Sequence, residues 1–126
     1  MKIQIREALF SDFKAVGELK KRNGLYRGCE ESKWFFLLHE NPVFQSAKAW
    51  QIGWVLEKNG CVVGYLGNIP LRYWYQGEPL LVAAAEGFTV DPECRGHSLK
   101  LIAAFFSQKT PDLLLSTSAN QATAEV

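Results

Sequence analysis

The sequence has few of the features that mark a secreted, metal-binding or membrane protein. Its 126 residues include only three cysteines, Cys29, Cys61 and Cys94, which lie far apart and form no C-x-x-C pair. Such cysteines argue against a disulfide scaffold or a zinc site and fit the reducing cytosol. No apolar run is long enough to span a membrane, and the first residues lack a signal-peptide core. We therefore expect a cytoplasmic protein with no metal and no membrane partner.

The sequence also lacks an excess of charge of one sign. Fourteen Lys and Arg residues stand against thirteen Asp and Glu residues, for a formal net charge of +1. Nothing in this balance favours nucleic acid as a partner, so any bound anion must be held by local geometry. The length predicts a single domain over residues 1–126, and no internal repeat or low-complexity segment divides it.

Hydrophobic periodicity predicts a mixed α/β chain. Strands are expected at Lys2–Glu7, Gly53–Lys58, Val62–Tyr75, Glu78–Val90 and Leu113–Ser118. Helices are expected from Ser11 and Asp12 to Gly24, over Lys33–Glu40, from about His97 to Ser107, and from Asn120 onward, with a loop at Val43–Ile52. Asn59-Gly60 and Gln76-Gly77 are signals of two-residue hairpins, so the middle strands should form an antiparallel meander. A right-handed crossover should place the last strand parallel to Leu81–Val90.

Three details of this pattern carry further expectations. Pro70 lacks an N–H group, so it should mark a bulge or an edge position in its long strand. The rings of Tyr73-Trp74-Tyr75 should alternate and cover both faces of the sheet. The run Lys20-Lys21-Arg22 is interpreted as a solvated helix end.

The most informative stretch runs from Phe88 to Leu101. A β-rich run ends at Asp91 and Pro92, the turn Arg95-Gly96-His97-Ser98 follows, and an apolar helical pattern begins. The first amides of a helix have no intrahelical partner, and the helix dipole makes that end positive. A phosphate satisfies both, so this order of strand, turn and helix predicts a phosphate cradle.

The element order and this motif together resemble the GCN5-related N-acetyltransferase superfamily, which has the acyl-CoA N-acyltransferase fold. In that family a Gln/Arg-x-x-Gly-x-Gly/Ala pattern follows the fourth strand, and its amides hold the pyrophosphate of coenzyme A. Arg95 matches the first position, whereas Ser98 and Lys100 stand where the family has small residues. Asn120 is the second similarity, because the family often has an Asn at the next helix start that contacts the acyl or pantetheine arm.

The resemblance implies an acyl-CoA-dependent N-acyltransferase with acetyl-CoA as co-substrate. The backbone near Phe88–Val90 would polarise the thioester carbonyl, and the following turn and helix would hold the rest of the cofactor. The implied coenzyme A contacts are Phe88, Thr89, Val90, Arg95, Gly96, His97, Ser98, Leu99, Lys100 and Asn120. The acceptor is an amine whose class stays open among a small amine, an amino sugar and a peptide.

Glu86 is the candidate general base. It lies among small residues in the middle of a strand, where a carboxylate needs a partner or a wet cleft. Strand alternation places it on an otherwise apolar face with Phe88, Val90, Ala84 and Val82. The alternative is that Glu86 is a solvent-facing strand residue.

The family fold normally continues through the rest of the Asn120 helix and two further strands. The sequence ends at Val126, so we expect an N-terminal portion truncated after the fifth strand and at best weakly active. Its last strand, Leu113–Ser118, would then offer an exposed sheet edge to a second copy and form a homodimer. The alternative function is a non-catalytic binding or dimerising domain, because the pyrophosphate loop is degenerate at both of its usual small positions.

Overall fold

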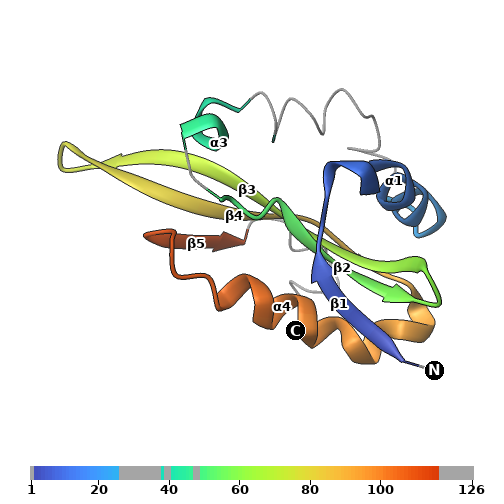
Figure 1. Ribbon diagram of the computed structural model, residues 1–126. Coiled ribbons are helices and arrows are strands. Elements are labelled where there is room, and N and C mark those ends of the chain that lie inside the picture. The colour runs from blue at the N-terminus through green and yellow to red at the C-terminus, as the bar shows by residue number, and fades with distance from the viewer. Residues whose placement is uncertain (1, 26–37, 39–40, 47–48, 117–126) are drawn as a thin grey trace.

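The computed structural model describes residues 2–25, 38, 41–46 and 49–116, and these form a five-stranded sheet with helices on both faces (Figure 1). The strands are β1 Ile3–Glu7, β2 Gly53–Lys58, β3 Cys61–Tyr75, β4 Glu78–Val90 and β5 Leu113–Ser116. The helices are α1 Phe13–Arg22, α3 Pro42–Ser46 and α4 Ser98–Phe106, with 3-10 segments η1 Phe10–Asp12 and η2 Pro92–His97. In this part of the chain, no helix is long and apolar enough to cross a membrane.

The sheet follows the chain, with the spatial order β1-β2-β3-β4-β5. The pairs from β1 to β4 are antiparallel, and β5 is parallel to β4 after the crossing through α4. Both hairpin turns have two central residues at positive φ: 53° and 78° at Asn59 and Gly60, and 50° and 80° at Gln76 and Gly77. Positive φ at both positions defines the type I′ turn. The predicted mixed sheet, its meander and its parallel last strand are therefore confirmed.

The core lies on both sides of the sheet, under α1 on one face and under α4 on the other (Figure 1). Leu19 of α1 and Leu101 of α4 are fully buried. Phe105 of α4 packs edge-on against Trp54 of β2, with ring centroids 6.5 Å apart. These contacts hold α4, and with it the turn that precedes it, against β2 and β3.

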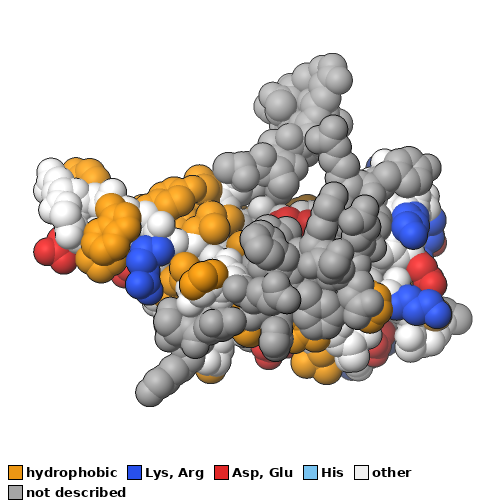
Figure 2. Space-filling view, turned by 90° about the horizontal axis from the view of Figure 1, so that it is seen from above, with side chains coloured by type: hydrophobic (Ala, Val, Ile, Leu, Met, Phe, Trp, Pro, Cys, Tyr) orange, Lys and Arg blue, Asp and Glu red, His pale blue; other side chains and the backbone are white. Residues whose placement is uncertain are grey.

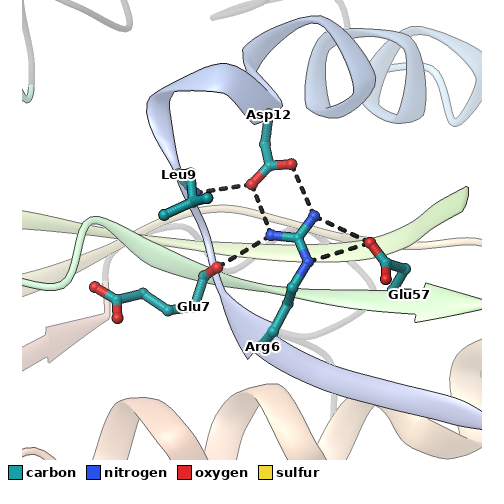
Figure 3. A network of polar contacts seen from close by, with 5 residues as sticks. All are labelled: Arg6, Glu7, Leu9, Asp12 and Glu57. Carbon is teal, nitrogen blue, oxygen red and sulfur yellow. Dashed lines mark hydrogen bonds and ion pairs between the residues drawn. The ribbon is translucent and has the colours of Figure 1, made fainter. Parts of the chain in front are cut away.

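A network of charged groups joins β1, β2 and the start of α1 (Figure 3). The Arg6 guanidinium donates to both carboxylate oxygens of Asp12 at 2.9 Å and to Glu57 at 3.1 Å. Asp12 also accepts the N–H of Leu9 at 2.8 Å. Its side chain therefore stabilises the segment before α1 and makes no capping hydrogen bond to α1 itself. The hydrogen bond from Arg6 holds the pKa of Asp12 below its ordinary value.

The segment expected as a loop at Val43–Ile52 begins with a short helix, α3, and this prediction was wrong. Asn41 accepts the N–H of Val43 at 2.8 Å, and Pro42 occupies the first helical position. Asn followed by Pro therefore starts a helix here, because the side chain caps it and the missing N–H of proline is not needed. Except for Leu38, which is buried, the helices expected at Lys33–Glu40 and from Asn120 lie outside the described residues.

The strands β3 and β4 extend beyond the rest of the sheet as a two-stranded ribbon (Figure 1). We call the part formed by 71–75 and 78–81 the arm. The β2 strand pairs with β3 only as far as Gly67, so in the described structure Pro70 has the edge position expected for it. The β5 strand pairs with β4 only from Val82 onward. Hydrophobic side chains gather along the arm (Figure 2), and Trp74 at its end is 68% exposed. Tyr73 and Tyr75 are also exposed on the arm, and the expectation that the three rings cover both faces of the sheet stays a prediction.

Candidate functional site

A β-bulge in β4 lies at the candidate base. Tyr65 of β3 pairs with Thr89, and Gly67 pairs with Glu86, so β4 has one residue more than β3 in this interval. Gly87 takes up the bulge with a φ of +67°, in the region that favours glycine. The extra residue reverses the alternation, so Glu86 shares a face with Thr89. The prediction that Glu86 shares a face with Phe88 and Val90 was therefore wrong.

Glu86 lies in a polar cluster under α1. The ammonium of Lys20 is 3.1 Å from one carboxylate oxygen, and the hydroxyl of Tyr65 is 3.3 Å from the other. The Lys20 side chain is 1% exposed and its ammonium lies 5.1 Å from the centre of the Tyr65 ring. The Glu86 side chain keeps 24% of its surface exposed. The carboxylate therefore has a bound partner on each oxygen, in a side chain that is partly exposed.

Two glycines make room for this cluster. A Cβ at Gly87 would lie 2.8 Å from Cε and 2.9 Å from Nζ of Lys20. A Cβ at Gly67 would lie 2.5 Å from the Tyr65 hydroxyl and 2.6 Å from a carboxylate oxygen of Glu86. A side chain at either position would force one of these polar groups to shift, since real Cβ atoms do not approach other atoms so closely. The strands are therefore built around the three polar groups.

The end of α1 also binds the last residue before the turn. Arg22 donates to both oxygens of Asp91, at 3.0 Å and 2.7 Å, and to the carbonyl of Val62 at 2.8 Å. Asn23 donates to Asp91 at 2.8 Å. The hydrogen bond from Arg22 keeps the pKa of Asp91 below its ordinary value. The interpretation of Lys20-Lys21-Arg22 as a solvated helix end was wrong for Lys20, which is buried, whereas Lys21 and Arg22 are exposed.

The turn after β4 is the 3-10 helix η2, which runs directly into α4. The amide of Cys94 donates to the carbonyl of Asp91 at 2.9 Å, and the buried Cys94 side chain anchors the turn. The amide of Ser98 donates to the carbonyl of Arg95. The α4 helix begins at Ser98, one residue after the predicted start. The order of strand, turn and helix is present, and its role as a phosphate cradle stays a prediction.

The predicted coenzyme A contacts lie along one continuous path from the bulge into α4. Thr89 and Val90 are buried, Phe88 is partly exposed, and Arg95 and Gly96 are exposed on η2. His97 and Ser98 are half-buried, and Leu99 is 73% exposed. Lys100 points back to β1, where its ammonium donates to the carbonyl of Ile3 at 3.2 Å. Asn120 lies outside the described residues.

The roles of three residues of the site, Lys20, Arg22 and Gly87, were not predicted from the sequence. The signal for Lys20 was present, since Phe13, Val16, Leu19 and Lys20 recur at helical spacing and mark one buried face. The signal for the bulge was Gly87 itself, because an isolated glycine in a strand often marks a bulge. Arg22 carried no comparable signal.

No protein-family model matches the sequence, and no curated protein is similar to it by sequence. Solved structures are similar in fold. Glucosamine-6-phosphate N-acetyltransferase from Arabidopsis thaliana matches with a TM-score of 0.68 and 12% identity, over 99% of this chain and 88% of that chain. The aminoglycoside N-acetyltransferase AAC(6')-Iy in complex with CoA matches with a TM-score of 0.62 and 17% identity, over 98% of this chain and 82% of that chain. A GCN5-related N-acetyltransferase from Kribbella flavida matches with a TM-score of 0.60 and 14% identity, over 82% of this chain and 26% of that chain.

The chain has the GCN5-related N-acetyltransferase fold. The family resemblance is thus confirmed at the level of the fold, including the mixed α/β sheet. In this fold the described residues bring together the bulge of β4, the Glu86 carboxylate and the turn into α4. Sequence identities of 12% to 17% with the first two of these proteins carry no information on the acceptor.

Proposed function

We propose that the chain is an acyl-CoA-dependent N-acyltransferase that transfers an acetyl group from acetyl-CoA to an amine. The observation that carries the proposal is Glu86. Its carboxylate is bound by Lys20 and Tyr65, its side chain is 24% exposed, and it lies at the bulge of β4. A cytoplasmic location stays a prediction from the cysteines.

In the proposed reaction Glu86 accepts a proton from the acceptor ammonium, directly or through one water. The freed amine attacks the thioester carbonyl, the new N–C bond forms, and the C–S bond breaks. The nitrogen then loses its extra proton to the leaving thiolate, so the products are the amide and the thiol. Backbone N–H groups between Phe88 and Val90 polarise the carbonyl, since a bulge leaves its extra residue outside the ladder. Most of the acceleration comes from holding the two reactants together.

The proposed pyrophosphate site is formed by the amides from Gly96 to Leu99. In this structure the Ser98 amide donates to the Arg95 carbonyl, and a bound phosphate would replace that bond with a stronger, charge-assisted one. Arg95, exposed on the same turn, adds positive charge. No step of the proposal requires a metal.

Thermal unfolding with acetyl-CoA tests the cradle. Acetyl-CoA at about 100 times its dissociation constant should stabilise the wild type by about 2.7 kcal/mol. Gly96→Pro should abolish this effect, because proline has no N–H and fixes φ. Gly96→Ala is the matched control, since a Cβ at Gly96 meets no atom within 4 Å and the N–H is kept. Unchanged stabilisation of Gly96→Pro would place the cradle elsewhere.

Thiol release from acetyl-CoA with a panel of amines tests the reaction. Glu86→Gln should lower turnover by about 100-fold or more, the usual contribution of a general base, while it keeps the stabilisation by acetyl-CoA. Turnover of Glu86→Gln equal to that of the wild type would remove Glu86 from the mechanism. A wild type that neither binds acetyl-CoA nor releases thiol would reject the proposed activity.

The second candidate is a non-catalytic domain that dimerises through the edge of its sheet. Within the described residues β5 has β4 as its only neighbouring strand, and Leu113 is 47% exposed. An exposed apolar edge can pair with a second copy. Light scattering separates the candidates: a dimer that Leu113→Lys converts to a monomer, without any response to acetyl-CoA, favours this second function.

A further inference from the structure

The end of α1 contacts both ends of the short segment from Glu86 to Asp91, which comprises the end of β4 and the residue after it. Lys20 binds Glu86 at the start of that segment, and Arg22 and Asn23 bind Asp91 at its end. We call the residues 20–23 the clasp. The segment from Glu86 to Asp91 contains the bulge and leads directly into the turn η2. One helix end therefore holds both the candidate base and the candidate cofactor turn.

We infer that the clasp has two separable positioning roles. Lys20 orients the Glu86 carboxylate toward the acceptor, whereas Arg22 orients the coenzyme A turn through Asp91. This inference rests on the proposed function, because it names what positions the base and the cofactor of that reaction.

The position of Lys20 supports the first role. Its ammonium is buried, and burying a charge is costly unless the charge is paired and hydrogen-bonded. The ammonium occupies the space above Gly87 and binds one oxygen of Glu86, while Tyr65 binds the other. A carboxylate held on both oxygens has lost the rotational freedom that a free side chain would keep. The side chain keeps 24% of its surface exposed, and the inference places the acceptor amine at that exposed part.

The geometry of Arg22 supports the second role. The guanidinium binds Asp91 through two parallel hydrogen bonds, a geometry that fixes direction as well as distance. The Asp91 amide donates to Val63 in the sheet, and its carbonyl accepts the Cys94 amide in η2. Asp91 is therefore the point at which the sheet ends and the turn begins. Its side chain sets the angle at which η2 leaves β4.

The chain offers a matched set of variants. Lys20→Met keeps the length of the side chain and removes the charge, and Arg22→Gln removes the two-pronged contact with Asp91. Lys21→Ala is the control, because Lys21 lies between them in the clasp and is exposed. Each variant is measured for kcat and KM with acetyl-CoA by thiol release, and for CoA affinity by calorimetry.

Lys20→Met should lower kcat by about 100-fold, the cost of a displaced catalytic group, with the CoA dissociation constant within about twofold of the wild type. Arg22→Gln should raise the CoA dissociation constant and the KM for acetyl-CoA by about tenfold, because a charge-assisted contact that orders the binding site is lost. The change in kcat should be smaller. Lys21→Ala should match the wild type in all three quantities.

The inference is wrong if the wild type is active but the two variants change the same parameter, or if neither changes any parameter. If Lys20→Met does not fold, Lys20→Gln takes its place, since its side chain is polar but neutral and one atom shorter than that of lysine, and the same criterion applies. A wild type with no CoA binding and no turnover would reject the proposed function and the inference together. These outcomes are distinct, because only the last one is read from the unmodified protein.

Discussion

Gly87→Ala tests whether the Lys20 ammonium occupies the space above the bulge. The new Cβ would lie 2.8 Å from Cε and 2.9 Å from Nζ of Lys20, and 3.3 Å from the Tyr65 ring. Lysine tips usually move aside easily. Here the side chain is 1% exposed and its ammonium is bound to Glu86, so it has to give up that contact in order to move.

Two costs add up in this variant. A non-glycine residue at a φ of +67° costs about 1 to 2 kcal/mol relative to glycine. Loss of the hydrogen bond between two charged groups adds about 1.5 to 3 kcal/mol, and the partial exposure of Glu86 places the value at the lower end of that range. The expected loss in free energy of unfolding is therefore about 3 kcal/mol, about half of it from Lys20.

Gly60→Ala separates the two costs. Gly60 has a φ of +78°, and a Cβ there meets no atom within 4 Å, so only the backbone cost applies. Urea unfolding should show Gly87→Ala to be less stable than Gly60→Ala by about 1.5 kcal/mol. The excess should disappear in a Lys20→Ala background, where the colliding atoms are gone. Equal losses in the two alanine variants would refute the placement of Lys20.

Two further predictions concern stability. Asp12 and Asp91 have pKa values below the ordinary 3.8, mainly because Arg6 and Arg22 donate hydrogen bonds to them. Folded values below the unfolded ones mean that the stabilisation is complete above the unfolded pKa and is lost as pH falls, so urea unfolding should show a decrease below about pH 4. Asp91→Asn should flatten this decrease, and an unchanged pH dependence would contradict the pairing. Asn68 is fully buried and donates to the Gln51 carbonyl and the Gln108 side chain. Asn68→Ala should therefore lower the free energy of unfolding by about 2 kcal/mol. Gln51→Ala is the control and should change it by almost nothing, because Gln51 is exposed.

The central sheet was predictable because its signals are local. Asn59-Gly60 and Gln76-Gly77 adopt the positive φ values of type I′ turns, and each turn fixes the register of the two strands that it joins. The parallel pairing of β5 followed from the crossing helix and from the handedness of such crossings. The extension of the arm was not predictable, since it depends on where β2 and β5 stop pairing, and no short-range pattern encodes that.

The site was predictable only in part. Glu86 was recognised as an unusual carboxylate in a strand, but its partner Lys20 lies 66 residues away. Pairing over such a distance depends on how α1 crosses the sheet. The bulge at Gly87 also reversed the face on which Glu86 lies, and alternation cannot anticipate an inserted residue.

The strand order of the sheet has a consequence for the order of folding during synthesis. The three strands from β2 to β4 are joined by two-residue turns, so each can pair as soon as the next is made, and short loops close rapidly. The β1 strand is synthesised first, but its pairing partner is β2. Arg6 of β1 can bind Glu57 only after 51 further residues have been synthesised. The meander is therefore expected to fold as the nucleus. The N-terminal strand β1 would then pair with the edge of the meander formed by β2. The delay before this pairing depends on the rate of translation.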